Sequence, residues 1–254
     1  MLRVGEFGGT FQLDPRSHLF QRVVLDGHYE PEVATLCRRL ADPARDAVDV
    51  GANAGFFSVL LAGHLADGRV LAVEPSETMA SRLRANLQRN GVRDRVVVFE
   101  GAASDRTGTA DLTGIEGMEE YGTIGALAHP AVQDETKRRV HTVATRTLDD
   151  LVAAHGLRPG FVKVDVEGAE PLVFRGAESI LREHRPVVLS ELNDRLLRAN
   201  GSSAREVLRL FEAVGYRVLD PFAPGMPVAR IDDLETPHLL EEVLCLPAEH
   251  ALAG

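Results

Sequence analysis

A glycine-rich turn lies between the first buried apolar run of the chain and an apolar stretch of helical spacing. The run Ala47 to Val50 leads into this turn, which is made of Gly51, Ala52, Asn53, Ala54 and Gly55, and Phe56 follows it. Glycines at such a place let the backbone turn tightly and approach a ligand closely. The dinucleotide fingerprint needs glycines two and five positions after the first, where this chain has Asn53 and Phe56. NAD is therefore disfavoured.

Two carboxylates flank this turn along the chain. Glu74 closes the next buried run, about one strand–helix unit after Gly51, where a carboxylate can accept hydrogen bonds from both vicinal hydroxyls of a ribose. Asp49, just before the turn, can meet a cationic amino group. A ligand with an amino acid end and a nucleoside end is S-adenosylmethionine. We therefore favour this cofactor over the alternative that Glu74 is only a solvated strand end.

A second group of acidic residues follows a later apolar run. Lys163 and Asp165 are two residues apart on a predicted strand, so their side chains share one face. Asp165 and Glu191 end neighbouring strands, and with Asn193 they could converge near a transferable methyl group. Three interpretations stay open for this group: acceptor-binding or general-base carboxylates, oxygen ligands for Mg²⁺, and structural partners of Lys163 and arginines. We favour the first; a Mg²⁺ site of Asp165, Glu191 and Asn193 is not favoured.

Histidine suits proton transfer near neutral pH. The candidates are His28, His129, His141 and His155, and His28 is assigned as the catalytic candidate because it lies next to a motif described below.

The elements that must position these residues alternate between strands and helices. Buried apolar runs predict strands over residues 47–50, 70–73, 96–99, 161–165, 186–189, 216–219 and 242–246. Helical spacing predicts helices over 31–40 and 56–65, a third that Gly91 ends, and a fourth from Ser203 to about Gly215. Such alternation is typical of the α/β class, a mostly parallel sheet with helices on both faces.

We expect a single domain over residues 1–254, because no linker divides the chain. Residues 1–45 form an N-terminal arm, with short strands between Val4 and Leu13. Residues 106–160 are too long for a simple crossover and predict an inserted hairpin with a glycine-rich loop. This insertion is either a substrate lid or a structural embellishment.

The composition of the chain limits the kinds of partner that we expect it to bind. The 254 residues carry 28 basic and 38 acidic side chains, a formal charge of −10, which disfavours nucleic acid. No run approaches the roughly 18 apolar residues of a membrane span. Cys37 and Cys245 lie far apart, which argues against a thiolate zinc site, and the first residues do not resemble a signal peptide. We expect a cytoplasmic protein with a small-molecule partner; a homodimer is left open.

At this point the chain resembles the FkbM family of S-adenosylmethionine-dependent methyltransferases. The resemblance covers roughly residues 20–220. It rests on motifs at residues 27–32, 48–58, 73–75, 102–105, 146–151, 162–170 and 185–191. The resemblance implies the class I methyltransferase fold, a Rossmann-like sheet of seven strands whose last strand is antiparallel.

The resemblance also implies roles for single residues. It puts Asp49, Gly51, Asn53 and Gly55 at the methionine end of the cofactor and Glu74 on the ribose. It puts Ala102, Ala103 and Ser104 near the adenine, with Tyr29 closing over the site; Ala52, Phe56 and Pro75 complete the cofactor set. The implied reaction is O-methylation of a small secondary metabolite or a sugar. Nitrogen and carboxylate acceptors stay open, as does a non-catalytic or differently specific nucleotide-binding protein on the same fold.

Overall fold

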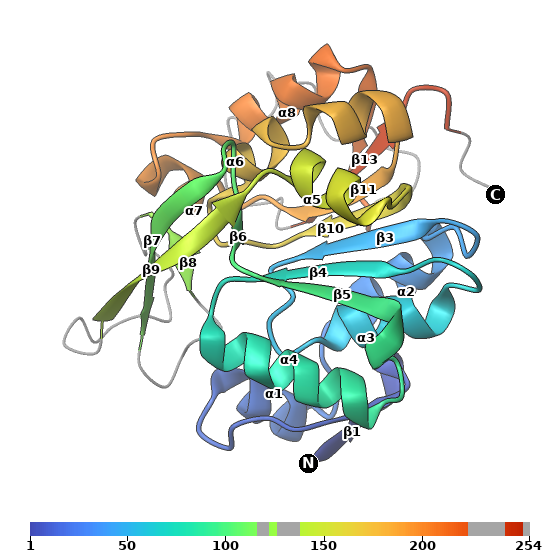
Figure 1. The fold of residues 1–254 in the computed structure, drawn as a ribbon, viewed down its shortest axis with the longest axis vertical. Coiled ribbons are helices and arrows are strands. Elements are labelled where there is room, and N and C mark those ends of the chain that lie inside the picture. Colours follow the sequence, from blue (N-terminus) through green and yellow to red (C-terminus); the bar gives the residue numbers. More distant parts are fainter. Residues whose placement is uncertain (116–121, 126–137, 223–241, 251–254) are drawn as a thin grey trace.

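A seven-stranded sheet forms the centre of the computed structural model, which describes residues 1–115, 122–125, 138–222 and 242–250 (Figure 1). Its spatial order is β12-β13-β11-β10-β3-β4-β5. The strands are β3 (Asp46–Val50), β4 (Val70–Glu74), β5 (Val96–Glu100), β10 (Pro159–Val164), β11 (Val187–Glu191), β12 (Tyr216–Leu219) and β13 (Glu242–Pro247). Only β13 runs antiparallel to its neighbours in this sheet. The predicted α/β fold, with its antiparallel last strand, is confirmed.

Helices cover both faces of the sheet, and the strand residues alternate between them. Val48 and Val50 pack in one core with the helices α5 (Leu148–His155), α6 (Glu170–Arg175) and α8 (Ala204–Ala213). Ala47 packs in the other core with α1 (His18–Asp26), α2 (Pro31–Leu40) and α3 (Phe56–His64). Figure 1 shows α4 (Glu77–Arg89) on this second side. A parallel sheet covered on both faces explains why its strands read as nearly continuous apolar runs.

The ends of several helices follow from single polar residues. Ser203 accepts a hydrogen bond from the Glu206 backbone at 3.3 Å, so the predicted N-cap of α8 is confirmed. Three of the helices that were not predicted are α1, α5 and α7 (Asp194–Ala199). Each begins at a polar cap that the sequence contains, namely Ser17, Thr147 and Asn193. These caps were the signal that could have located them.

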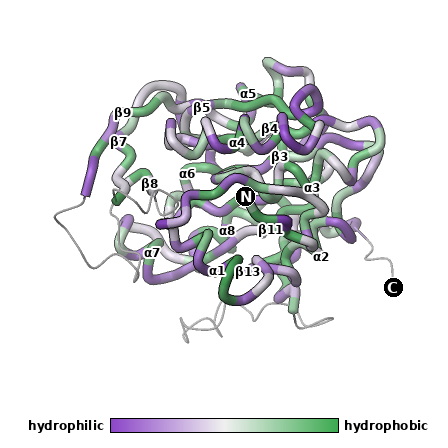
Figure 2. The backbone as a smooth tube through the Cα atoms, turned by 90° about the horizontal axis from the view of Figure 1, so that it is seen from below, coloured by the Kyte–Doolittle hydropathy of each residue, from purple (hydrophilic) through white to green (hydrophobic). Residues whose placement is uncertain are grey.

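A second sheet carries the predicted hairpin. It consists of β6 (Ala102–Ala103), β7 (Gly108–Ile115), β8 (Thr123–Ile124) and β9 (Arg138–Arg146), in the order β6-β9-β7-β8. The antiparallel pairing of β7 with β9 confirms the hairpin. Figure 2 shows the hairpin extending from the body of the molecule, with a hydrophilic far end. Most of the glycine-rich loop predicted here, at 116–121 and 126–137, lies outside the described residues.

The N-terminal arm packs against α3 and α4. It contains β1 (Leu2–Val4), a 3₁₀ turn (Gly5–Phe7) and β2 (Gly9–Phe11). Two buried or half-buried asparagines of α4 hold it: Asn90 Oδ1 accepts from Thr10 N at 2.9 Å, and Asn86 Oδ1 accepts from Gln12 N at 2.7 Å. The arm is therefore part of the same body as the sheet.

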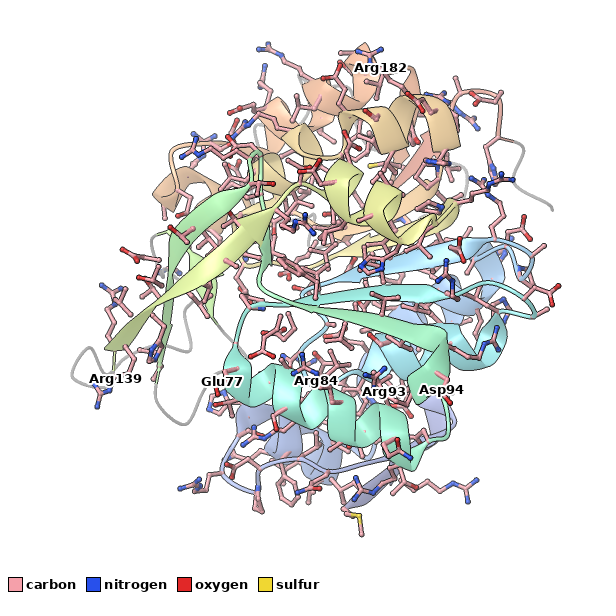
Figure 3. All side chains as sticks on the ribbon, in the orientation of Figure 1. Glu77, Arg84, Arg93, Asp94, Arg139 and Arg182 are labelled. Carbon is pink, nitrogen blue, oxygen red and sulfur yellow. The ribbon has the colours of Figure 1, made fainter. Side chains whose placement is uncertain are left out.

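Charged side chains lie mainly outside these layers. Figure 3 shows Arg182 on the outer helical layer and Arg139 at the far end of the hairpin. Within the part of the chain that the structure describes, no helix is both long and apolar enough to cross a membrane.

Candidate active site

A cavity of about 490 Å³ opens beyond the carboxyl ends of β3, β4, β10 and β11. In open parallel sheets, ligands bind at this edge. The structure brings together there predicted residues from six separate segments of the chain. They are Tyr29, Gly51, Ala52, Asn53, Phe56, Glu74, Pro75, Ala102, Ala103, Asp165, Glu191 and Asn193.

The glycine-rich turn packs directly on the end of β10. Gly51 has φ +80°, and a Cβ built on it would lie 1.8 Å from the carbonyl oxygen of Asp165. Glycine is therefore required here for the close approach of two backbones. Gly55 has φ +90° and begins α3; its Cβ would lie 2.5 Å from Leu83. Gly55 does not line the cavity among the described residues, so it supports the helix rather than a ligand.

Glu74 is oriented by the backbone around it. Its Oε2 accepts from Asn53 N and its Oε1 from Ser76 N, both at 2.8 Å. The side chain is 6% exposed, and burial raises its pKa to about 7. Each carboxylate oxygen has two lone pairs, so both oxygens can accept a further hydrogen bond. This geometry fits a pair of ribose hydroxyls.

Asp49 lies behind the cavity rather than on its surface. It is 1% exposed, and its Oδ2 accepts from Ser58 Oγ at 2.6 Å. Burial raises its pKa, and its Oδ1 has no hydrogen-bond partner among the described residues. Asp49 pairs in register with Lys163 on β10. The expected contact of Asp49 with a cofactor amino group is thus not direct in this structure.

Buried Lys163 and half-buried Asp165 form an ion pair, as their shared face predicts. Lys163 Nζ lies 2.9 Å from Asp165 Oδ2 and 4.4 Å from the centroid of the Phe57 ring. Burial lowers the pKa of Lys163, but the carboxylates of Asp165 and Glu242 outweigh it, so the pKa stays above its ordinary value. Lys163 is therefore a permanent cation and not a base at neutral pH.

Three carboxylates converge at the ends of β10 and β11. One oxygen each of Asp165, Glu167 and Glu191 lies within 4.8 Å of the other two. Burial, followed by the Asp165 charge, raises the pKa of Glu167 to about 8. Burial also raises the pKa of Glu191 well above its ordinary value, and its carboxyl hydrogen-bonds to Asp165. A protonated Glu191 that donates a hydrogen bond to the Asp165 carboxylate accounts for both the raised pKa of Glu191 and its contact with Asp165.

Several predicted site residues lie elsewhere. Asn193 borders the cavity, but its Oδ1 caps α7 by accepting from Arg195 N at 3.2 Å. The third oxygen beside Asp165 and Glu191 therefore comes from Glu167 and not, as the sequence suggested, from Asn193. Ser104 does not line the cavity, because its carbonyl faces Gly176 and its hydroxyl bonds to Asp105.

His28 is exposed next to the left-handed Gly27 that ends α1, and it does not border the cavity among the described residues. The structure therefore does not bring the His28 side chain to the lining shared by Asp165 and Glu191. His141 and His155 are also exposed and away from the cavity, and His129 lies outside the described residues.

Several cavity-lining side chains carried no assigned role in the sequence analysis, among them Arg22, Glu30, Phe57 and Glu242. Glu30 precedes Pro31 and caps α2 in a left-handed conformation, φ +44°. Proline is common at the first position of a helix, so Pro31 signals the start of α2 but not the place of Glu30 in the cavity. Glu242 reaches the cavity only because β13 is antiparallel, so no local signal in the sequence indicates it.

Comparison with known proteins agrees with this geometry. The family model described as the methyltransferase FkbM domain matches residues 49–218. The chain is 28% identical over 218 residues to the 31-O-demethyl-FK506 methyltransferase FkbM of Streptomyces tacrolimicus, covering 74% of this chain and 80% of that protein. It is 26% identical over 237 residues to the AMB antimetabolite synthetase AmbE of Pseudomonas aeruginosa, covering 81% of this chain and 11% of that protein.

A solved structure shares the fold. The methyltransferase FkbM of Methylobacillus flagellatus superposes with a TM-score of 0.50 at 17% identity, over 92% of this chain and 62% of that one. The family match spans more than half of the chain and contains the turn, Glu74 and the acidic convergence. The chain therefore belongs to the FkbM family of S-adenosylmethionine-dependent methyltransferases.

Proposed function

We propose that this chain binds S-adenosylmethionine in the cavity and transfers its methyl group to a hydroxyl oxygen of a small molecule. The observation that carries the proposal is the single cavity lined by the Gly51 turn, by Glu74 and by Asp165. The oxygen acceptor is supported by the FkbM relative, which is named a methyltransferase of 31-O-demethyl-FK506.

The residues fit the cofactor in three ways. Glu74 presents two oriented oxygens that match the vicinal hydroxyls of a ribose. The ring of Tyr29 stacks on Phe56, with centroids 5.2 Å apart, and both rings border the cavity. Finally, the cavity is rich in carboxylates, which suits a ligand that carries a sulfonium and an ammonium group.

The bound cofactor supplies an activated methyl group on sulfur: the carbon–sulfur bond breaks as the oxygen–carbon bond forms, and a neutral thioether leaves. The protein must then align the acceptor and receive its proton. In this proposal Asp165 accepts the hydroxyl proton, Lys163 holds the Asp165 carboxylate in place at 2.9 Å, and Glu191 donates a hydrogen bond to it. A geometrically held base within hydrogen-bond reach is what general-base catalysis requires.

We further propose that the reaction does not require Mg²⁺. The ammonium of Lys163 already occupies one Asp165 oxygen among the three convergent carboxylates, and it supplies a positive charge beside the reacting oxygen. A small-molecule acceptor, rather than nucleic acid, agrees with the acidic lining of the cavity.

Calorimetric titration with S-adenosylhomocysteine tests the proposal, with NAD as the comparison ligand and with EDTA or Mg²⁺ present. Saturable binding of the thioether is expected, with no binding of NAD and no dependence on Mg²⁺. Glu74→Ala should weaken binding by about 100-fold, because two hydrogen bonds to a charged group are lost.

Glu77→Ala, an exposed carboxyl three residues further on, is the matched control and should bind like the wild type. Glu74→Gln checks that a loss of binding does not reflect misfolding. Binding of NAD, or equal affinity of the Glu74→Ala protein, would contradict the proposal.

A further inference from the structure

Strand β8 is the part of the inserted hairpin that borders the cavity. Its residues Thr123 and Ile124 line the cavity beside Glu167. Register pairing of Thr123 with Thr113 fixes β8 to β7. The hairpin is therefore in a position to act on the reacting groups, which a structural embellishment would not be.

The Thr123 hydroxyl binds the loop between β10 and α6. Thr123 is 2% exposed, and its Oγ1 lies 3.2 Å from the carbonyl oxygen of Val166 and 3.0 Å from that of Glu167. A threonine hydroxyl has one hydrogen to donate, and both acceptors belong to the segment 166–168, which we call the 166–168 loop. The hydroxyl is thus a direct link from the hairpin to the loop that carries Glu167.

The 166–168 loop is held from two sides in a strained conformation. Glu167 has φ +56°, which costs free energy for a residue other than glycine. Oε1 of the buried Glu170 accepts from Val166 N at 3.3 Å and from Gly168 N at 3.2 Å. Glu170 therefore holds amides of the loop, while Thr123 holds its carbonyls. Strained backbone persists only where its surroundings over-determine it, and it clusters at functional sites.

A second contact links the hairpin to the same loop. A Cβ built on Gly125, the residue after β8, would lie 2.2 Å from Asn200 Oδ1, and a Cβ built on Gly168 would lie 2.8 Å from Asn200 Nδ2. Asn200 follows α7, and Figure 1 shows β8 beside that helix. The end of β8 and the 166–168 loop therefore pack closely on the same side chain.

Asp165, by contrast, is held independently of the hairpin. Its amide donates to the Val50 carbonyl at 3.0 Å, and its carboxylate binds Lys163. One oxygen each of Asp165, Glu167 and Glu191 lies within 4.8 Å of the other two. A shift of the 166–168 loop would therefore move Glu167 relative to Asp165, at the place where the proposed function puts the transferred methyl group.

We propose that the inserted hairpin is a functional part of the active site and that Thr123 is a positioning residue: its hydroxyl holds the 166–168 loop so that the Glu167 carboxyl faces the sulfonium of the bound cofactor. Glu167 then stabilises the positive charge of S-adenosylmethionine, which the thioether product lacks. The hairpin thereby helps to distinguish the cofactor from the product. This role rests on the proposed function, since it concerns the reacting end of the same cavity.

The ratio of two dissociation constants tests this role without knowledge of the acceptor. The constants for S-adenosylmethionine and S-adenosylhomocysteine are measured by calorimetry on the full chain at pH 8.5. Burial raises the pKa of Glu167 to about 8, so its carboxyl is largely ionised at that pH. Thr123→Val keeps the side-chain volume and removes the hydroxyl. It should weaken S-adenosylmethionine relative to S-adenosylhomocysteine by about three- to fivefold, the upper range for one ion pair that is not fully desolvated.

Two further hydroxyl variants are the controls. Thr123→Ser keeps the donor and should keep the wild-type ratio. Thr142→Val removes an exposed hydroxyl that bonds to Asp111 within the hairpin, and it should also leave the ratio unchanged. An unchanged ratio in Thr123→Val, including an equal loss of affinity for both ligands, would reduce the hydroxyl to a structural role and overturn the proposal.

A double-mutant cycle tests whether Thr123 acts through Glu167. Glu167→Gln should lower the relative affinity for S-adenosylmethionine by a similar factor, and Thr123→Val should lower it no further in that background. Additive effects of the two substitutions, or a wild-type ratio in Glu167→Gln, would overturn the proposal. The Glu167→Gln result decides the matter even if Thr123→Val does not fold.

Failure of this role is distinguishable from failure of the proposed function. If the wild type binds S-adenosylhomocysteine and Thr123→Val does not change the ratio, only the positioning role is overturned. If the wild type does not bind S-adenosylhomocysteine, the proposed function is overturned, and the positioning role with it.

Discussion

Single residues of the site are held by contacts that leave little freedom to substitute them. Glu74 is oriented by two backbone amides, Lys163 by a carboxylate and a ring, and Gly51 by the Asp165 carbonyl. The Glu74–Asn53 contact joins the ends of β4 and β3, and the Gly51–Asp165 contact joins the ends of β3 and β10. The contacts that orient these site residues therefore also hold the strand ends together.

Gly51→Ala should therefore destabilise the protein by at least about 3 kcal/mol, since the new Cβ would lie 1.8 Å from the Asp165 carbonyl at a positive φ. Gly63→Ala is the control, because nothing lies within 4 Å of its Cβ and the residue is inside α3. That change should stabilise the protein by roughly 0.5–1 kcal/mol. Urea denaturation measures both; equal effects of the two substitutions would show that the turn tolerates a side chain.

Glu170 makes the folded state less stable as the pH rises. Its Oε1 accepts from Val166 N and Gly168 N, its Oε2 has no partner among the described residues, and burial raises its pKa from 4.5 to about 7. Between these two values the folded protein binds a proton that the unfolded chain has lost, so stability falls with increasing pH. The stabilisation of the folded state by the proton on Glu170 is fully present below about pH 4.5, and it is lost as the pH rises through about 7.

Glu170→Gln keeps the acceptor oxygen and removes the titration. The free energy of unfolding of the variant, relative to the wild type, should rise by about 2–3 kcal/mol between pH 5 and pH 8. Urea denaturation at the two pH values measures this difference, and the exposed Glu212→Gln should show no such change. A difference that is flat with pH would mean that Glu170 is ionised without penalty.

At the scale of elements, the inserted hairpin is attached to the site by one short strand. Thr123 in β8 is 2% exposed, and its hydroxyl lies 3.2 Å from the Val166 carbonyl and 3.0 Å from that of Glu167. This contact joins the hairpin to the loop between β10 and α6. Glu167 lies in that loop at φ +56°, so the hairpin helps to hold a strained residue of the cavity lining.

Thr123→Val should make the loop between β10 and α6 more mobile. The change keeps the side-chain volume and removes the hydroxyl, which costs about 1–2 kcal/mol because the carbonyls lose their partner. Hydrogen–deuterium exchange of a peptide over residues 164–170 should become faster. Thr142→Val, whose exposed hydroxyl bonds only to Asp111 on the same hairpin, should leave that peptide unchanged; equal exchange in both variants would argue against the attachment.

For the whole molecule, the sheet separates two helical layers, and the cavity lies where the strands of both halves end. A ligand there contacts β3, β4, β10 and β11 together, so it should stabilise the molecule as one unit. The N-terminal arm contributes through Tyr29, whose ring lies on Phe56 of α3. Binding and global stability are consequently linked.

S-adenosylhomocysteine at about 100 times its dissociation constant should add about 2.7 kcal/mol of stability. For a chain of 254 residues this corresponds to a rise in Tm of roughly 5–10 °C. Calorimetric melting with and without the ligand measures the shift, and NAD at the same concentration should have no effect. A single transition that moves as a whole is expected; a shift confined to part of the unfolding would show that the arm unfolds separately.

The sequence by itself determined the sheet, the helices α2, α3, α4 and α8, and the part of the cavity formed by Gly51 and Glu74. Those features depend on local signals: continuous apolar runs for strands buried on both faces, polar caps, and a glycine turn followed one unit later by Glu74. Parallel strands end at a common edge, so Gly51, Glu74 and Asp165 were bound to meet once the strands were recognised.

Tertiary structure alone decided what surrounds the reacting atoms. The sequence suggested that Asp49 contacts a ligand, but its side chain accepts a hydrogen bond from Ser58 and does not line the cavity among the described residues. Glu242 lines the cavity because β13 is antiparallel to β11. His28 does not line it among the described residues, because it follows the exposed end of α1. Burial, register and strand direction are properties of the assembled sheet, and they determine which carboxyl groups line the cavity and how far burial raises the pKa of Glu167 and Glu191.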